Sequence, residues 1–348
     1  MKKESSTIYN APISSSSERT LSLERRGIKG LSLLLSFLFS LLAVFSSCSG
    51  SETSKQPAPS ASTDSTVLRI AVFPALDALP LALANDWGVF DSLGVKAELV
   101  VFRSQMDAEK AIADGKADAV LTDMFRVGWW QWQHRPVRFA FSTGRQLFIV
   151  PNKVLRISRI DQLDDRMIAC SRHSQEDYFA DRVIAQIKLR KGQILRPQIN
   201  SVELRLSMLQ AGQLDAAVLG TQQALKAHAT GCPSLHEPQV QKAIHGFAGI
   251  AFSTLSIKEK GHQLSQLRKA YNIVVGRLHS MTAMPQIDEQ TRSSLFLNEG
   301  IDTLLDVKTD FTLATRPTEN LRLTVAEWLN SRGATKGYSA DTLFTVNQ

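Results

Sequence analysis

Two segments of this chain repeat one short pattern, and their spacing constrains the fold more than any other feature. GKADAVLTD begins at Gly115 and GQLDAAVLGT begins at Gly212, 97 residues further on. In each segment a helical pattern ends on glycine, a natural C-terminal cap, and an Asp-Ala pair follows after two intervening residues. An apolar strand then leads into a polar loop. The copies are too far apart for a stacked repeat, and their spacing favours two lobes of similar build.

The residues before the first copy alternate between strand and helix patterns. Residues 67–73 (VLRIAVF) form an apolar run of the length and character of a buried parallel strand, and residues 97–102 (AELVVF) form a second one. Between them a helical pattern starts at Leu79, and Pro80 is compatible with its first turn. A helix around MDAEKAIAD then leads to the strand before Asp123. This order predicts a doubly wound α/β unit.

The same analysis predicts the second lobe and the return of the chain. A strand at residues 166–171 (RMIACS) and a helix from Ser174 would open the second lobe, and GIAFSTLSI from Gly249 would return to the first. Leu321, Val325, Trp328 and Leu329 form one apolar helical face, which predicts that the tail packs on lobe one. We therefore expect an α/β protein with two doubly wound lobes joined by a hinge. Lobe one comprises residues 66–143 and 251–348, and lobe two comprises residues 144–250.

The N-terminal region predicts export. A basic flank precedes a run of fifteen apolar or small residues from Leu31 to Phe45, and small residues then lead to Cys48. This run is shorter than the ~20 residues that span a bilayer. We expect a signal peptide at residues 1–47 and a flexible Ser/Pro/Ala tether at residues 48–65. The FSSC that ends at Cys48 resembles the lipobox of bacterial lipoproteins, with Phe45 in place of the usual Leu, and this resemblance implies lipidation of Cys48. The alternative is an ordinary signal peptide that is cut near Ser47.

Charge and cysteine usage exclude several classes of function. The formal net charge of +7 falls to +4 once the leader is removed, and there is no block of Lys and Arg of the kind that binds nucleic acid. Cys170 and Cys232 could pair in an oxidising compartment, and the sequence leaves this open. No Cys/His cluster has the spacing of a zinc site, so we expect neither a metal nor a cofactor.

One long segment carries a resemblance to a known family. The run from Phe73 to Asp123 looks like the start of type II periplasmic solute-binding proteins of the group that serves sulfonates, taurine, nitrate and thiamine-precursor pyrimidines. It has the strand, the Pro-containing loop, the helix ending in Gly-x-Phe and the later Gly-x-x-Asp-Ala of that group. The resemblance extends over about residues 67–333.

The resemblance implies a monomeric, non-enzymatic lipoprotein. It would sit on the periplasmic face or the cell surface, bind a small molecule between two lobes and deliver it to an ABC permease. One alternative is an enzyme on the same scaffold, acting in thiamine-pyrimidine or menaquinone precursor chemistry, although no nucleophile elbow, metal motif or paired carboxylates are found. The other is a sensory lipoprotein that binds a ligand without transport.

Ligands of open α/β sheets bind outside the carboxyl ends of the strands. Because the loop from Phe73 to Pro80 has no phosphate-binding glycines, it suits a small solute better than a nucleotide. The positions after the predicted strands give the candidate ligand-binding residues: Phe73, Asp77, Ser104, Asp123, Met124, Arg145, Ser171, Arg172, His173, Ser174 and Thr221.

Several candidates also have purely structural interpretations. Asp77 and Asp123 could each cap the helix that follows. Arg172 could be a surface residue paired with Glu176, and His173 could be a hydrogen-bonded surface residue. Asp118 and Asp215, in the repeated segments, are predicted to fix the turn from helix to strand.

Two further groups bear on the ligand. Phe125, Trp129 and Trp132 have helical spacing that favours core packing, which leaves Trp130 as the tryptophan most suited to reach the cleft. Arg103, Arg126, Arg145 and Arg172 lie near predicted strand ends. They favour an anionic or zwitterionic ligand, with a neutral heterocycle as the second choice.

Overall fold

The computed structural model describes residues 66–187, 193–235, 237–295, 297 and 310–334. The predicted signal peptide, the tether and Cys48 lie outside these residues. Within them, no helix has both the length and the apolar character needed to cross a membrane.

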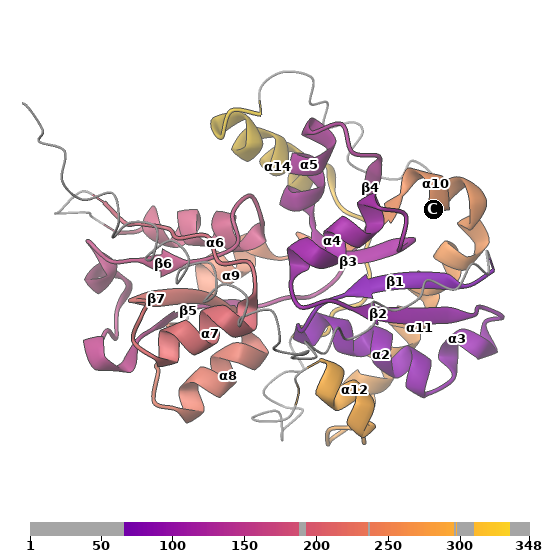
Figure 1. Cartoon of the computed structure of the whole chain (residues 1–348), viewed down its shortest axis with the longest axis horizontal. Helices are drawn as coiled ribbons and strands as arrows, with labels where there is room; N and C mark the ends of the chain where they lie inside the picture. The colour runs from indigo at the N-terminus through magenta and orange to yellow at the C-terminus, as the bar shows by residue number, and fades with distance from the viewer. Residues whose placement is uncertain (1–65, 188–192, 236, 296, 298–309, 335–348) are drawn as a thin grey trace, which may run out of the picture. The chain divides into compact units, whose positions relative to one another are not determined.

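A five-stranded sheet, sheet A, organises the first lobe (Figure 1). Its strand order is β2-β1-β3-β8-β4, in which β1 pairs in parallel with β2 and β3, and β8 runs antiparallel to β3 and β4. The strands are β1 (Leu68–Val72), β2 (Ala97–Val101), β3 (Ala119–Asp123), β4 (Val137–Ser142) and β8 (Ala248–Ser253).

Helices cover both faces of sheet A, which explains why β1 and β3 are buried along almost their whole length (Figure 1). One face carries α2 (Leu79–Asp86), α3 (Val89–Ser92) and α11 (Gly261–Ser280), and the other carries α4 (Gln105–Ala113), α5 (Met124–Trp132) and α14 (Glu319–Ser331). Shorter elements complete this lobe: η1 (Leu76–Ala78), α10 (Thr254–Glu259) and α12 (Glu289–Ser294). Pro80 lies in the first turn of α2, as predicted.

A smaller sheet, sheet B, organises the second lobe. Its order is β5-β7-β6, with β5 antiparallel and β6 parallel to β7. Its elements are β5 (Leu147–Pro151), η2 (Lys153–Leu155), η3 (Ile160–Leu163), β6 (Ile168–Ala169), α6 (Gln175–Ile184), α7 (Val202–Gln210), β7 (Ala216–Gly220), α8 (Thr221–Ala229) and α9 (Pro238–Ile244). The strand predicted at 166–171 is thus shortened to two residues, extended by isolated bridges at Met167 and Cys170.

The repeated Gly-x-x-Asp-Ala segments have the same structural role in both lobes: the glycine ends a helix, and the aspartate binds the backbone of another strand. Gly115 and Gly212 end α4 and α7 with left-handed backbones, at φ values of 70° and 78°. Asp118 then accepts a hydrogen bond from the backbone N–H of Arg69 at 2.8 Å, and Asp215 accepts one from Met167 at 2.9 Å. Each carboxylate therefore joins the start of its own strand to the neighbouring parallel strand, β3 to β1 in the first lobe and β7 to β6 in the second. The carboxylates thus bind neighbouring segments, and their predicted role in the turn itself stays a prediction; the α/β fold with two lobes is confirmed.

The C-terminal helix α14 contacts both lobes. It packs on α5, as predicted for the tail, and Val325 and Leu329 are fully buried there. Trp328 also packs edge-on against Phe125 at 5.0 Å, and its ring N–H donates to Asp181 of α6 at 2.7 Å. Sequence periodicity predicted that α14 packs on the first lobe. It did not predict the hydrogen bond from Trp328 to Asp181, because these residues lie 147 positions apart.

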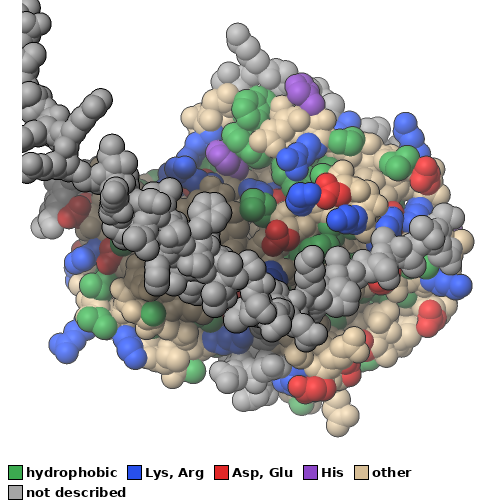
Figure 2. Space-filling view, viewed as in Figure 1, with side chains coloured by type: hydrophobic (Ala, Val, Ile, Leu, Met, Phe, Trp, Pro, Cys, Tyr) green, Lys and Arg blue, Asp and Glu red, His purple; other side chains and the backbone are tan. Residues whose placement is uncertain are grey.

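Charged side chains are mixed on the face shown in Figure 2. There the Lys and Arg side chains of the described residues alternate with Asp and Glu. On this face, positive and negative side chains are therefore interspersed and do not form one large patch of a single sign.

Gly249 provides a test of the sheet packing. A Cβ atom at this position in β8 would lie 2.1 Å from the carbonyl oxygen of Phe141. We expect Gly249→Ala to lower the free energy of unfolding by about 1–3 kcal/mol, because the sheet must shift to admit the methyl group. Urea denaturation measures this change.

Gly276→Ala is the matched control. Gly276 lies on the exposed face of α11, and a Cβ there would have no heavy atom within 4 Å. Alanine should stabilise this helix by roughly 0.5–1 kcal/mol. Equal effects of the two substitutions would contradict the tight strand packing at Gly249.

Candidate functional site

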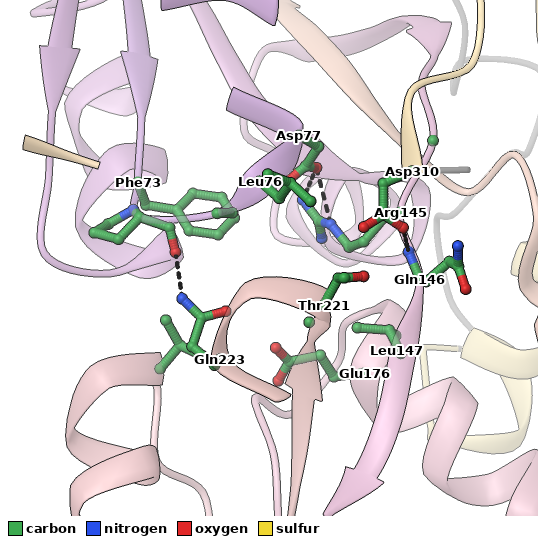
Figure 3. A pocket seen from close by; sticks show the side chains of 15 residues that line it. Phe73, Leu76, Asp77, Arg145, Gln146, Leu147, Glu176, Thr221, Gln223 and Asp310 are labelled. Carbon is green, nitrogen blue, oxygen red and sulfur yellow. Dashed lines mark hydrogen bonds and ion pairs between the residues drawn. The ribbon is translucent and has the colours of Figure 1, made fainter. Parts of the chain in front are cut away.

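Residues of both lobes line one pocket (Figure 3). It contains about 420 Å³ of space between side chains, part of it open to solvent. The first lobe contributes the connection after β1, the second contributes the first turns of α6, α7 and α8, and the crossover between β4 and β5 runs along one side. The lining residues are Phe73, Pro74, Ala75, Leu76, Asp77, Gly144, Arg145, Gln146, Leu147, Glu176, Val202, Gly220, Thr221, Gln223 and Asp310.

Arg145 and Asp77 form a buried ion pair in this pocket. The Nε and Nη2 atoms of Arg145 lie 2.9 and 2.6 Å from one carboxylate oxygen of Asp77. Their side chains are 8% and 2% exposed, and the guanidinium carbon lies 5.5 Å from the centre of the Phe73 ring. Asp77 is therefore the partner of Arg145, and the prediction that it caps the following helix is wrong: α2 has no side-chain cap.

A direct contact between lobes closes the pocket beside Phe73. The Gln223 side chain donates to the carbonyl of Pro74 at 3.2 Å and to Glu203 at 3.0 Å. Because Gln223 lies on α8 and Pro74 follows β1, this hydrogen bond joins the two lobes (Figure 3).

Asp310 lies at the side of the pocket next to the crossover. It is 2% exposed, and it accepts a hydrogen bond from the backbone N–H of Gln146 at 3.1 Å. Its backbone packs so closely on Gly144 that a Cβ at that glycine would lie 2.1 Å from the Asp310 carbonyl oxygen. Burial raises the pKa of Asp310 to about 7, the Thr221 hydroxyl and Gln146 act against this shift, and the nearby Asp77 carboxylate adds to it.

A second ion pair lies behind the cleft wall of the first lobe. The Nη2 and Nε atoms of Arg126 lie 2.5 and 2.9 Å from Oε2 of Glu109, and both side chains are buried. Thr122 donates to the other Glu109 oxygen at 2.9 Å. The remaining guanidinium nitrogen, Nη1, donates to the carbonyl of Arg172 in the second lobe at 2.9 Å.

Asp123 is the N-cap of α5. Its carboxylate accepts the backbone N–H of Arg126 at 3.0 Å and the side chain of Gln105 at 2.9 Å. Burial raises the pKa of Asp123 to about 6, whereas the Arg145 charge and the Gln105 hydrogen bond act against the shift. The capping interpretation of Asp123 is confirmed, and its ligand role stays a prediction.

Trp129 rather than Trp130 reaches the second lobe. The Trp129 ring stacks on His173 with centroids 3.6 Å apart and planes within 3°. Trp130 is 4% exposed and lies in the core. The prediction for Trp130 is therefore wrong, because it is Trp129 that contacts a residue of the second lobe.

His173 has a constrained setting beside Trp129. Its backbone is left-handed, with φ at 56°, and its N–H donates to Asp177 at 3.0 Å. Partial burial, together with the nearby Arg126 and Arg172 charges, lowers the pKa of the His173 ring, while Asp177 opposes this shift.

Arg172 does not pair with Glu176. The Arg172 side chain is exposed, whereas Glu176 accepts from Nη2 of the fully buried Arg205 at 2.7 Å and from the backbone of Ser171 at 2.8 Å. The expected surface pair is therefore wrong. Arg205 takes its place because α7 packs beside the first turn of α6.

The remaining predicted residues divide between caps and core. Ser104 caps α4 by accepting from Asp107, and Ser174 caps α6 by accepting from Glu176. Met124 and Ser171 are buried near the strand ends. Of the predicted candidates, the pocket brings together Phe73, Asp77, Arg145 and Thr221, and its lining does not include Ser104, Asp123, Met124, Ser171, Arg172, His173 or Ser174.

Sequence reasoning missed Gln146, Glu176, Gln223 and Asp310 as lining residues. Gln146 and Gln223 lie one or two positions from predicted residues, so a wider window after each strand would have included them. Glu176 was assigned only to a surface pair. Asp310 lies in a segment without a periodic pattern, and no sequence signal pointed to it.

The cysteines and acidic residues suggest no metal chemistry in the described part of the chain. No three His, Cys, Asp or Glu side chains are grouped there so as to hold a metal ion. Cys170 and Cys232 are both buried and free, which answers the question of pairing left open by the sequence. Burial raises the pKa of the Cys170 thiol to about 12, so it stays protonated at neutral pH.

The two lobes, the strand order and the pocket between them define the periplasmic binding protein fold. No protein-family model matches the sequence, and no curated protein matches it as a relative. Among solved structures, the ligand-binding component of an ABC-type import system from Staphylococcus aureus, with zinc bound, aligns at a TM-score of 0.63 and 10% identity, over 80% of this chain and 96% of that chain.

Two further neighbours agree on the fold. The alkanesulfonate-binding protein SsuA from Xanthomonas axonopodis pv. citri, bound to MOPS, aligns at a TM-score of 0.60 and 16% identity, over 80% of this chain and 96% of that one. A Candida albicans gene product with the generic periplasmic binding protein fold aligns at 0.57 and 12% identity, over 80% and 93%. The predicted fold is confirmed, and the structural neighbours include solute-binding proteins of ABC transporters.

Asp310→Asn tests the electrostatics of the pocket. An aspartate in the unfolded chain titrates near ~3.9, so between about pH 4 and pH 7 the folded protein keeps a proton that the unfolded chain has released. Raising the pH through this window lowers the free energy of unfolding. Asparagine cannot ionise, so the variant should melt at a higher temperature than the wild type at pH 8 and at nearly the same temperature at pH 4.

Asp161→Asn is the control, because Asp161 is 56% exposed and lies on the surface of the second lobe. It should show no comparable gain at pH 8. A stability difference for Asp310→Asn that is the same at both pH values would rule out the buried, protonated carboxyl.

Proposed function

We propose that this chain is an exported solute-binding protein that captures a small molecule between its two lobes and delivers it to an ABC permease. The observation that carries the proposal is the pocket itself, which is lined by the connection after β1 and by the first turns of three helices of the other lobe. Ligands of open α/β sheets bind at such strand ends. The structural neighbours from S. aureus and X. axonopodis, which are named for ligand and alkanesulfonate binding, support it.

In this proposal the lobes comprise residues 66–143 with 251–348, and residues 144–250. The crossovers near Gly144 and before β8 would act as the hinge. Closure would bury the solute and bring together the surface that a permease recognises.

The proposed solute is small and anionic or zwitterionic. Arg145 supports this because it is the cation that lines the pocket. Asp77 already occupies its guanidinium, however, so a simple anion would have to compete with a buried carboxylate. A zwitterion suits this arrangement better. Its negative group can take the place of Asp77 on Arg145, and its positive group can then pair with the displaced Asp77 carboxylate.

We further propose that the protein is monomeric and is anchored to the membrane through lipidated Cys48. Residues 1–47 would direct export, and residues 48–65 would tether the folded lobes to the surface. The apolar run and the small residues before Cys48 support this assignment.

A thermal-shift screen tests the binding proposal. The compounds are alkanesulfonates, taurine, nitrate, pyrimidines and amino acids. A true solute at about 100 times its Kd should add ~2.7 kcal/mol to the free energy of unfolding. Arg145→Gln should abolish most of this gain, whereas Arg159→Gln, at a residue whose side chain is 72% exposed, should preserve it.

Two results would count against the binding proposal. One is that no compound class shifts the melting temperature. The other is that Arg159→Gln reduces the shift as much as Arg145→Gln does, which would place binding away from the pocket.

The anchor is tested by Cys48→Ser. The variant should move from the membrane fraction to the soluble fraction and keep the wild-type melting temperature, because the lipidated thiol is lost while the lobes are untouched. Ser49→Ala is the control and should stay with the membranes. Retention of Cys48→Ser in the membrane fraction would contradict lipidation.

A further inference from the structure

The pocket holds more carboxyl groups than the cations around it can balance. Asp77 is paired with Arg145, and Glu176 is paired with the buried Arg205. Asp310 has no salt-bridge partner among the residues that the structure describes. It is therefore the unbalanced acid of the pocket (Figure 3).

The backbone, rather than a cation, holds Asp310 in place. The residue is 2% exposed, and its carboxyl accepts the Gln146 N–H at 3.1 Å. Its close packing on Gly144 leaves no room for a side chain at that position. A buried carboxyl fixed in this way is costly unless it is protonated or meets a positive group.

A second observation points to the same place from the other lobe. Thr221 begins α8 and lines the pocket, and it is 6% exposed. Its hydroxyl oxygen is buried and makes no hydrogen bond within 3.5 Å, although it lies close enough to the Asp310 carboxyl to act against the rise in that group's pKa. Buried hydroxyl groups are normally satisfied, so an unsatisfied one in a pocket marks a position for a ligand group.

The Asp310 carboxyl and the Thr221 hydroxyl suit a ligand group that donates hydrogen bonds better than one that accepts them. A carboxylate only accepts hydrogen bonds, and a hydroxyl can accept as well as donate, whereas an ammonium group has three donors and no acceptor. An ammonium between them would satisfy both and would also balance the unpaired acid.

We propose that the solute carries a primary ammonium group that binds Asp310 and Thr221. This inference rests on the proposed function, since it assigns the solute class of the same pocket. The rival, a plain anion on Arg145, would displace Asp77 and leave two buried acids without a cation in the pocket.

The test uses matched pairs of probes that differ in the amine: taurine and ethanesulfonate, β-alanine and propionate, and ethylammonium and ethanol. Binding is measured by calorimetry on the wild-type protein at pH 8. In at least one pair, the member with the amine should bind at least about tenfold more tightly than its partner. Ethylammonium should compete for binding with the amine-bearing member of that pair.

Two variants locate the effect. Asp310→Asn and Thr221→Val should each weaken the amine-bearing probe, the first by about tenfold or more, because a charge-assisted contact is lost. Asp161→Asn, on the exposed surface, should leave it unchanged. Thr221→Val keeps the shape of the side chain and removes only the hydroxyl, so it still tests the site if Asp310→Asn alters the fold.

Three outcomes overturn the inference. One is that the amine-free members bind as tightly as their partners, and another is that neither variant weakens binding. In both cases the effect of Arg145→Gln on the binding of any solute still tests whether the pocket is the binding site, so the proposed solute-binding function can stand without the ammonium site. The third is that none of the amine-bearing probes binds, which rejects the ammonium site, whereas the wider screen decides the proposed function separately.

Discussion

The buried pair of Glu109 and Arg126 is the interaction on which the arrangement of the cleft depends. Arg126 uses two nitrogens to bind Glu109 and a third to bind the carbonyl of Arg172 across the cleft. An isolated charge at this depth would be prohibitive, and each partner removes the cost of the other. The same side chain thus joins α4 to α5 within the first lobe and holds the second lobe against them.

This contact extends to the pocket through the start of α6. The Arg172 carbonyl lies two residues before Ser174, the cap of α6, and the first turn of that helix carries Glu176 into the pocket. Glu176 in turn binds Arg205 of α7. Next to Arg172 in the chain, His173 stacks on Trp129 of α5 and adds a second contact between the lobes. Strand ends, helix caps and paired charges therefore place the lining residues together, and among the described residues Asp310 remains as the pocket acid without a salt bridge.

The sequence predicted what depends on local rules. The strands of sheet A, Pro80 in the first turn of α2, and the helix ends at Gly115 and Gly212 follow from periodicity, capping and glycine placement within about ten residues. It predicted four pocket residues, Phe73, Asp77, Arg145 and Thr221, because they come directly after strands. It did not predict which charges would meet: Arg205 with Glu176 and Asp310 beside Gly144 depend on packing between distant segments. The sequence also misjudged Trp130, because which side of α5 meets the second lobe depends on packing between distant segments.

The stability of Arg126→Met, alone and combined with Glu109→Leu, tests this account most directly. The single substitution leaves Glu109 buried without a partner and should lower the free energy of unfolding by about 3–5 kcal/mol. The double substitution removes both charges at similar volume and should recover most of that loss. A single substitution that costs less than about 1 kcal/mol, or a double that is no more stable than the single, would show that Glu109 and Arg126 do not compensate each other's buried charge.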